Sequence, residues 1–307
     1  MRPQSAIIHK SGPHSLFLTF KVKDRSKKLA QAIADLDPYI ANVKKFDRVY
    51  SAISFGEAYW KHITPSSDGI PEGIRTFNGI EGDYPAPATG GDIFLHLNGK
   101  HADLNYEVAW NWLQSTKGGL EVIHEQACAR YLDERDIIGF IDGTENPESS
   151  QERKKAALIK ASADSKLLTA SSFVFVQTFQ HKIAKWNALT TLDQEYVIGR
   201  TKEASLELAE DRKPPTAHIS RVVIEEDGEE LEIVRHSLQY FKVRGSKGLV
   251  FVAYTRDLDI IEKMLARMFG TADEFHDKLM EYTTPITGAM FFTPSKELLD
   301  LIKKAKE

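Results

Sequence analysis

Hydrophobic and polar positions follow two different spacings along the chain, and their order predicts four strand–helix units. Short runs of β-branched and aromatic residues predict strands, whereas apolar residues three or four positions apart predict amphipathic helices. The predicted strands begin at Leu16, Ile93, Phe173 and Leu249, which are 77, 80 and 76 residues apart, and a helical pattern follows each of them. This spacing is too long for a solenoid repeat and indicates two similar domains with two units each.

The remaining apolar segments complete each domain. Further strands are predicted over residues 50–59, 120–131, 230–238 and 288–292. Each half then contains two strand–helix–strand units, which is the ferredoxin-like plan of an antiparallel sheet with helices on one face. The predicted fold class is therefore α+β, with two tandem ferredoxin-like domains over residues 1–147 and 148–307. A generic α+β mixture is the alternative.

Two segments interrupt the periodic pattern. Residues 64–91 are rich in Gly, Pro, Ser and Asp, and a loop of this length usually covers a site or an interface. Residues 146–165 are polar, with clustered Lys and Arg, and we interpret them as the link between the two domains. A turn that continues as a surface helix is the alternative for this second segment.

Composition and charge exclude several classes of function. Of the 307 residues, 42% are hydrophobic and 27% are charged, as in an ordinary globular protein. The 40 Lys and Arg are outnumbered by 44 Asp and Glu, which argues against a nucleic-acid partner. The single cysteine, Cys128, excludes a disulfide framework, a cysteine-based zinc ribbon and covalent haem attachment through two thiols. No stretch approaches the ~18 apolar residues of a membrane span or resembles a signal peptide, so we expect a cytoplasmic protein with no membrane partner.

The most unusual segment covers residues 137–147 and has the sequence IIGFIDGTENP. We interpret residues 137–141 as a strand that ends in an Asp-Gly turn, and a turn without further function is the alternative. In the functional interpretation, the two glycines let the backbone approach a flat ligand closely. Asp142 would then enter an apolar cavity, where burial tunes its pKa for proton transfer. The motifs of nucleotide, dinucleotide, serine-hydrolase and zinc-protease sites are absent.

Two other residues are candidates for chemistry. His218 follows a rigid pair of prolines, although a single histidine is more often a surface or core residue than a metal ligand. Arg235 lies among apolar strand positions, where a charge is costly unless it meets an anion or a ligand. A strand-edge arginine that faces solvent is the alternative.

Taken together, these segments resemble the dye-decolorising (DyP-type) haem peroxidases. Residues 139–143 match the family's GxxDG signature, and the AHISRV segment around His218 resembles its proximal-ligand region. Arg235 lies 17 residues further on, where the family places its distal arginine. Residues 277–295 resemble the family's run into and through its last strand.

The resemblance implies a haem peroxidase that reduces hydrogen peroxide to water through a ferryl intermediate and oxidises a small dye-, phenol- or porphyrin-like reductant. One non-covalent b-type haem would lie mainly in the second domain, with His218 as its iron ligand and Asp277 as the hydrogen-bond partner of that histidine. Asp142 would carry a proton between the two peroxide oxygens, and Arg235 would stabilise the charge on the leaving oxygen. The family also implies a homo-oligomer, a dimer or larger.

Further residues are expected at the cofactor: Gly143, Thr144, Glu145, Asn146, Ser237 and Asp277. Ser237 stands where many family members have asparagine, and its hydroxyl reaches less far than an amide. Because an aspartate has a lower reference pKa than a histidine, we expect activity at acidic to mildly acidic pH.

Three alternatives remain open from the sequence. The protein could carry haem or release its iron without catalysis, although a carrier needs neither Asp142 nor Arg235. It could bind RNA, because ferredoxin-like sheets build RNA-recognition motifs and residues 247–254 resemble one of the strand motifs of those domains. We prefer to interpret residues 247–254 as a buried strand. It could also be a haem-free relative with the same fold.

Overall fold

The computed structural model describes residues 1–160 and 166–305 and contains two similar sets of four antiparallel strands. In the first set, the order is β2-β3-β1-β4, with β1 (His14–Val22), β2 (Val49–Phe55), β3 (Ile93–Gly99) and β4 (Leu120–Ala129). In the second set, the order is β12-β5-β10-β9, with β5 (Ser172–His181), β9 (Leu238–Phe241), β10 (Lys247–Thr255) and β12 (Ala289–Thr293). Both orders are those of a ferredoxin-like sheet, so the predicted fold class is confirmed.

The two sheets join into one closed ring of strands. Phe55 of β2 pairs with Phe292 of β12, and Ala129 of β4 pairs with Gln239 of β9. Alternate side chains of both sheets meet in one buried cluster, so the sheets face each other across it. Its most deeply buried members include Phe17, Ala52, Phe94, Val174, Val252 and Tyr254.

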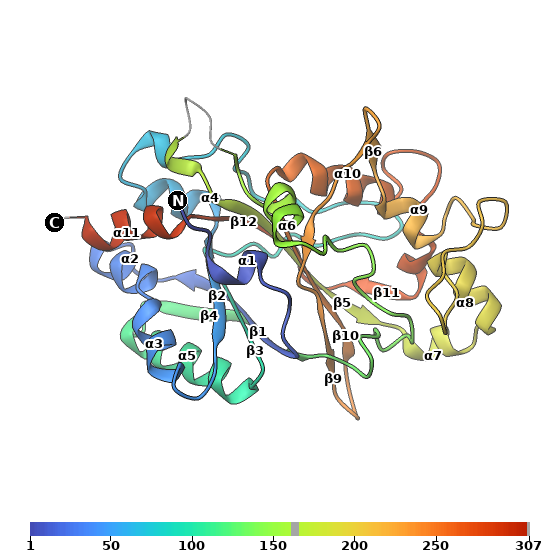
Figure 1. Cartoon of the computed structure of the whole chain (residues 1–307), viewed down its shortest axis with the longest axis horizontal. Helices are drawn as coiled ribbons and strands as arrows, with labels where there is room; N and C mark the ends of the chain where they lie inside the picture. Colours follow the sequence, from blue (N-terminus) through green and yellow to red (C-terminus); the bar gives the residue numbers. More distant parts are fainter. Residues whose placement is uncertain (161–165, 306–307) are drawn as a thin grey trace.

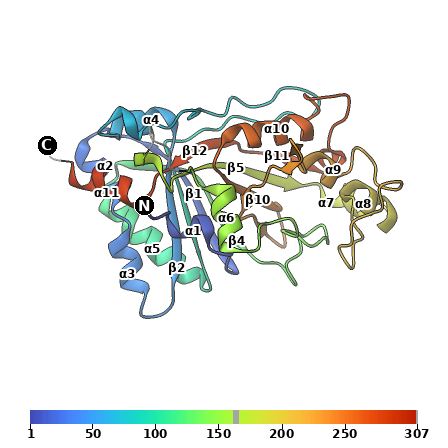
Figure 2. The ribbon, with the colours of Figure 1, turned by 45° about the horizontal axis from the view of Figure 1, so that its top comes forward.

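Most helices cover the outer faces of the sheets, whereas the short helices Ser5–Ile8 and Ser150–Ala157 contribute buried residues to the inner cluster. The first half carries α1 (Ser5–Ile8), α2 (Lys27–Ala34), α3 (Asp37–Val43), α4 (Glu57–Ile63), η1 (Ser67–Gly69) and α5 (Ala102–Ser115). The second half carries α6 (Ser150–Ala157), η2 (Lys166–Leu168), α7 (Ile183–Asn187), α8 (Thr191–Ile198), α9 (His218–Val222), α10 (Leu258–Met268), η3 (Lys278–Glu281) and α11 (Lys296–Lys304). Four short strands complete the chain: β6 (Glu225–Glu226), β7 (Glu229–Glu230), β8 (Val234–Arg235) and β11 (Thr283–Pro285). Helices α2, α3, α5 and α11 lie at one end of the molecule and α7, α8 and α9 at the other (Figures 1 and 2).

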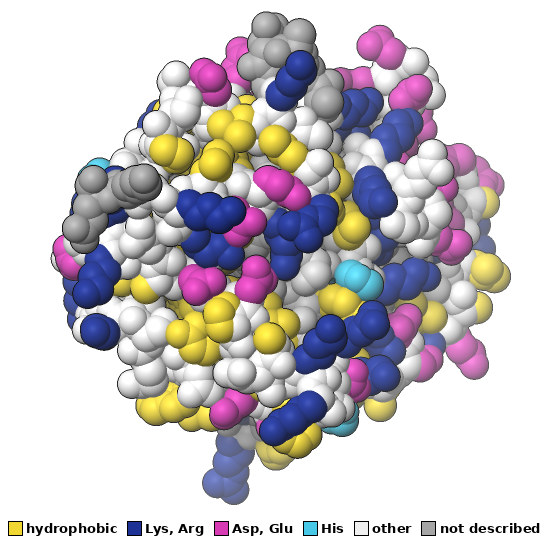
Figure 3. Space-filling model, turned by 60° about the vertical axis from the view of Figure 1, so that its left-hand side comes forward, with side chains coloured by type: hydrophobic (Ala, Val, Ile, Leu, Met, Phe, Trp, Pro, Cys, Tyr) yellow, Lys and Arg dark blue, Asp and Glu magenta, His cyan; other side chains and the backbone are white. Residues whose placement is uncertain are grey.

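The last helix closes the end of the molecule that carries α2. Its apolar face buries Leu298, Leu299 and Ile302. Its polar face forms exposed ion pairs, among them Lys296 with Asp37 at 3.0 Å, and such pairs each contribute little to stability. Figure 3, in which this end of the molecule is turned forward, shows basic and acidic side chains interspersed over the surface. None of the helices in the described ranges has the length and apolar composition that crossing a membrane requires.

The strand predicted over residues 50–59 is wrong in its second half, because β2 ends at Phe55 and a helix follows. The cause is Gly56, whose N–H donates to the carbonyl of Asp92. A Cβ at this position would lie only 2.4 Å from the carbonyl oxygen of Gly91. The chain can turn out of the sheet here because the residue has no side chain.

The strand predicted over residues 137–141 is also wrong. These residues lie in a loop, which an isolated antiparallel bridge between Arg135 and Ile141 draws into a short hairpin. Gly139 turns the chain with a φ of +97°, a conformation that a side chain would strain. The apolar run therefore packs as a turn against the second half instead of joining a sheet.

The strand predicted over residues 230–238 is displaced toward the C-terminus. Residues 231–233 leave the sheet and line a cavity, and the pairing with β10 begins at β8. Arg235 lies opposite Ala253, and Leu238 lies opposite Val250. This register places Ser237 opposite Phe251.

The other predicted segments agree with the structure more closely. Residues 120–131 and 288–292 correspond to β4 and β12, and residues 247–254 form β10. Residues 64–91 are irregular apart from η1 and a bridge between Ile80 and Ala86. In the predicted link, α6 forms a helix, as the alternative interpretation expected, while residues 161–165 lie outside the described residues.

Candidate active site

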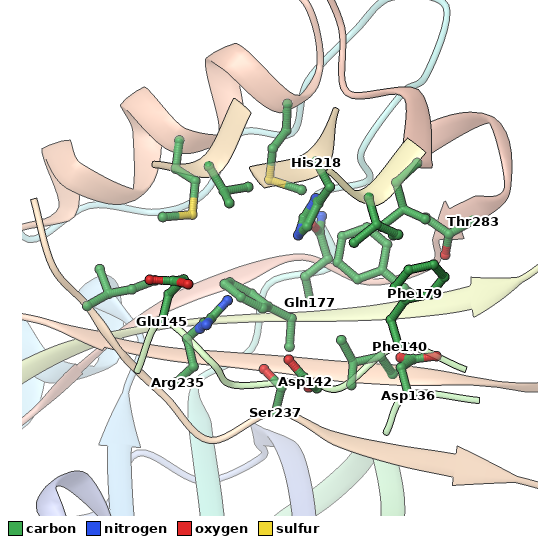
Figure 4. A pocket seen from close by; sticks show the side chains of 18 of the residues that line it. Asp136, Phe140, Asp142, Glu145, Gln177, Phe179, His218, Arg235, Ser237 and Thr283 are labelled. Carbon is green, nitrogen blue, oxygen red and sulfur yellow. The ribbon is translucent and has the colours of Figure 1, made fainter. Parts of the chain in front are cut away.

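A cavity opens between the sheet of β5, β8 and β10 and the helices α9 and α10 (Figure 4). It has about 1200 Å³ of space not filled by protein, counted out to the solvent at its mouth. Alternate residues of β5 point into it, as the pleat of a strand requires. Most of the wall is apolar and includes Phe140, Phe179, Leu249, Phe251, Met264 and Met268.

The structure brings five of the predicted site residues to this cavity: Asp142, Glu145, His218, Arg235 and Ser237. A second, more polar cavity of about 1290 Å³ adjoins it and shares Asp142, Arg235 and Ser237 with it. Three predicted residues line that second cavity instead: Gly143, Thr144 and Asn146. Asp277 lies behind His218, away from the cavity lining.

His218 is the first residue of α9, and its ring is fixed from behind by a carboxylate. Its Nδ1–H donates to Oδ2 of Asp277 at 2.6 Å, and Asp277 is completely buried. The other oxygen of Asp277 accepts a hydrogen bond from the N–H of Leu279 at 2.9 Å, which holds the carboxylate in place. The ring therefore presents Nε2 to the cavity (Figure 4).

Asp142 and Arg235 lie on the opposite side of the cavity from His218, together with Ser237 (Figure 4). Asp142 ends the hairpin of residues 134–142, and its N–H donates to the carbonyl of Glu134 at 2.9 Å. Burial raises the pKa of the Asp142 carboxyl, while the nearby guanidinium of Arg235 lowers it in part. A carboxylate with a raised pKa and a cation nearby is suited to accept and return a proton.

Arg235 is placed by its backbone, because none of the described residues forms a hydrogen bond or an ion pair with its guanidinium. The N–H of Arg235 donates to Oδ1 of Asn146 at 3.0 Å, and Nδ2 of Asn146 donates to the carbonyl of Arg235 at 2.9 Å. The guanidinium is thus free to meet an anion in the cavity. Asn146, predicted to contact the cofactor, here holds the arginine.

Asn146→Ala is expected to lower the free energy of unfolding by about 1–3 kcal/mol, because it leaves the backbone groups of Arg235 without partners. It should also slow any reaction that depends on Arg235, by less than removal of the arginine itself. Denaturant unfolding and activity assays would measure the two effects. The control is Asn111→Ala on α5, where the side chain bonds only to Glu107 of the same helix. Equal destabilisation by both substitutions would contradict the positioning role of Asn146.

Two polar side chains in the cavity wall contain buried atoms that no described residue satisfies. They are both amide atoms of Gln177 and the Oγ of Ser237. Gln177 lies opposite Phe251 in the sheet, and Ser237 lies on the other side of Phe251. Leaving such atoms unpaired costs about 1–3 kcal/mol each, so this part of the wall fits a ligand or ordered water with polar atoms.

Glu145 does not face the cavity as a lone charge. It forms an ion pair with Arg200, which also lies 3.7 Å from Glu207. Glu230 lines the cavity near this pair, and burial together with the charge of Glu145 raises its pKa. Arg200 therefore already balances carboxylates of the chain itself, and it offsets the charge of Glu145 in the cavity lining.

The sequence analysis missed four residues of the cavity lining, namely Asp136, Gln177, His181 and Thr283. It also missed Arg200, which pairs with Glu145 of that lining. Gln177 alone carried a local signal, because it is a polar residue inside the apolar run of β5. The others meet only through contacts between distant segments.

The chain matches two family models along most of its length. The model described as Dyp-type peroxidase, N-terminal covers residues 4–127, and that described as Dyp-type peroxidase, C-terminal covers residues 133–298. The chain belongs to the Dyp-type peroxidase family. It is therefore an enzyme, an oxidoreductase of the peroxidase class.

Similar proteins support the assignment to the Dyp-type peroxidases. The dye-decolorizing peroxidase of Mycolicibacterium paratuberculosis is 33% identical over 296 residues, which is 94% of this chain and 82% of the relative. A solved dye-decolorizing protein from V. cholerae is 34% identical, with a TM-score of 0.89 and coverage of 96% of this chain and 97% of the other. A variant of DypB from Rhodococcus jostii RHA1, solved in complex with heme, is 30% identical, with a TM-score of 0.91 and coverage of 99% of each chain.

Proposed function

We propose that this enzyme binds one b-type haem non-covalently in the cavity, reduces hydrogen peroxide to water and oxidises a small organic reductant. The observation that carries the proposal is the placement of the His218–Asp277 pair on one side of the cavity and of Asp142 and Arg235 on the other. The haem in the DypB variant from Rhodococcus jostii supports the choice of cofactor. A haem carrier would need neither Asp142 nor Arg235 at the cavity.

The residues of the cavity fit this cofactor. Nε2 of His218 would hold the iron, and the negative charge of Asp277 on Nδ1 would raise the basicity of that ligand. The apolar wall suits a macrocycle. Bound haem supplies a redox-active iron that takes two oxidising equivalents from peroxide and passes them on one electron at a time.

The chain itself moves the proton and stabilises the charge. The Asp142 carboxylate would accept a proton from one peroxide oxygen and return it to the other, which leaves as water. The guanidinium of Arg235 would stabilise the negative charge on that leaving oxygen. The unpaired Oγ of Ser237 would hydrogen-bond peroxide or water beside them.

The test is the absorbance spectrum of the haem-reconstituted protein before and after one equivalent of hydrogen peroxide. A strong Soret band that shifts rapidly would support a haem enzyme that activates peroxide. A Soret band that peroxide only bleaches would instead indicate haem carriage or iron release. No Soret band after reconstitution would overturn the cofactor assignment.

The rate of the reaction with peroxide is expected to fall as the pH drops through the pKa of Asp142, because only the ionised carboxylate accepts a proton. Burial raises that pKa above the ordinary value of 3.8, and Arg235 opposes the rise. The acid limb of the pH–rate profile, which is the range where the rate falls as the pH drops, should therefore lie at higher pH than for a free aspartate. Arg235→Leu should move this limb to still higher pH. Stopped-flow rates across acidic and neutral pH would measure the limb. A limb that moves to lower pH in Arg235→Leu would contradict this account.

The domain boundary, the oligomeric state and the location rest on sequence-based expectations. We place the boundary between the end of β4 and the start of α6, a range that includes the predicted division after residue 147. The cytoplasmic homo-oligomer remains a prediction, which light scattering of the purified protein and fractionation of cells would test. The identity of the reductant requires a substrate screen.

A further inference from the structure

Asp136 is a second aspartate in the cavity lining, and the proposed reaction does not use it. It lies near Phe140 and Thr283 in the wall (Figure 4). Its exposed fraction is 7%, and those of His181 and Thr283 are 9% and 3%. A carboxylate this deeply buried is costly unless other groups pair with it and hydrogen-bond to it.

Two groups contact the Asp136 carboxylate, and a third fixes one of those two. Nε2 of His181 lies 3.2 Å from its two oxygens, and Nδ1 of the same ring lies 2.9 Å from Oγ1 of Thr283. A hydroxyl either donates or accepts, so the Thr283 contact is kept whichever ring nitrogen carries a proton. The N–H of Ile138 donates to Oδ1 of Asp136 at 2.9 Å. Asp136 is thus held from β5 and from its own loop, and β11 fixes the histidine of β5.

That loop is the one that carries Asp142. The N–H of Asp136 donates to the carbonyl of Phe140 at 2.8 Å, and the N–H of Asp142 donates to the carbonyl of Glu134 at 2.9 Å. These bonds close the hairpin of residues 134–142 with one aspartate on each leg. Holding Asp136 against β5 therefore fixes the direction in which Asp142 leaves the hairpin.

We propose that Asp136, held by His181 and Thr283, is a positioning residue for Asp142: it fixes the hairpin that presents the Asp142 carboxylate and brings a second negative charge to bear on it. This inference rests on the proposed role of Asp142 as proton acceptor.

The charged groups that act on Asp142 come from three elements. Burial is the largest influence and raises the pKa of Asp142; Arg235 of β8 lowers it, Asp136 of the hairpin raises it, and His218 of α9 lowers it. In the first cavity the remaining titratable groups are His181, which pairs with Asp136, and Glu145, Glu230 and Glu232. In the second cavity the charged lining residues are Lys10, Arg130, Glu134, Glu148 and Arg153.

The test substitution is Asp136→Asn, which removes the charge and keeps an oxygen to accept from Ile138. In the full-length chain, carbon-13 NMR would follow the titration of the Asp142 carboxyl, with its signal assigned by its loss in Asp142→Asn. We expect that titration to move to lower pH by roughly half a unit to one unit in Asp136→Asn. The acid limb of the peroxide reaction should move in the same direction in the haem-loaded enzyme.

The matched control is Asp133→Asn, which removes a charge from the residue just before the hairpin. The Asp133 side chain is 65% exposed and pairs with Arg135, so solvent screens it. Both the Asp142 titration and the acid limb should stay in place in this variant. If Asp136→Asn does not fold, Asp136→Ser is the second variant. It removes the same charge and supplies a hydroxyl that can accept from the N–H of Ile138. We expect the same shift of the Asp142 titration to lower pH.

The outcomes separate this proposal from the proposed function. An unmoved Asp142 titration in the folded Asp136 variant overturns the proposal, and a uniform rate loss at every pH would then show that Asp136 supports the fold alone. A titration that moves while the acid limb does not would leave the action of Asp136 on Asp142 standing. That result would instead remove Asp142 as the proton acceptor of the reaction.

Discussion

Replacing His218 by alanine is expected to remove the iron ligand and to weaken haem binding by more than the roughly 10–100-fold that loss of an outer partner costs. The substitution empties the place of the ring at the start of α9 and leaves the buried Asp277 with the N–H of Leu279 as its remaining partner. Titration of the variant with haem, followed at the Soret band, would measure the loss. Circular dichroism would show whether the chain keeps its fold.

Added imidazole gives the sharper version of this experiment. The space left by the ring should admit free imidazole, whose N–H can donate to Asp277, so imidazole should restore much of the Soret band in His218→Ala. The matched control is His101→Ala, because that side chain is 56% exposed and precedes α5, in the first half of the chain. An unchanged Soret band in His218→Ala would mean that another residue holds the iron.

The periodic pattern of the sequence was sufficient to predict most strands of the two sheets. Strands such as β1, β3, β5 and β10 are apolar on the faces that the fold buries, so their local pattern and their final environment agree. The errors occur where a glycine and a tight backbone contact decide the path. Gly56 ends β2 because Gly91 approaches it, and Gly139 turns the hairpin, and neither contact is visible in the periodicity of hydrophobic residues.

The candidate site shows the same division between local and distant information. The segments around Asp142, His218 and Arg235 were recognisable by their motifs, and the structure brings all three to one cavity. Their supporting partners could not be read from local sequence. Arg200 meets Glu145 across 55 positions and His181 meets Asp136 across 45, and only the pairing of the folded chain creates these contacts.

Replacing Asp142 by asparagine is expected to slow the reaction with peroxide by about 10²–10⁴-fold, the usual contribution of a positioned general base. Arg235→Leu should slow it by about 10²–10³-fold, because it removes the cation aimed at the developing negative charge. Both variants should still bind haem, since neither side chain is the iron ligand. Stopped-flow rates and haem titrations would measure the two properties separately. The controls are Asp133→Asn and Arg244→Leu, an arginine in the exposed turn between β9 and β10.

At acidic pH, the rate loss of the double variant Asp142→Asn with Arg235→Leu should be smaller than the product of the two single fold-losses. Arg235 lowers the pKa of Asp142, so in Arg235→Leu a smaller fraction of Asp142 is ionised and part of the rate loss passes through the aspartate. That part is missing when residue 142 is already asparagine, so Arg235→Leu should cost less in that background. At pH values well above the acid limb, Asp142 is ionised with or without the arginine. The part of the Arg235→Leu rate loss that passes through Asp142 should then vanish. Equal costs of Arg235→Leu in both backgrounds at acidic pH would mean that the arginine acts on the peroxide oxygens alone.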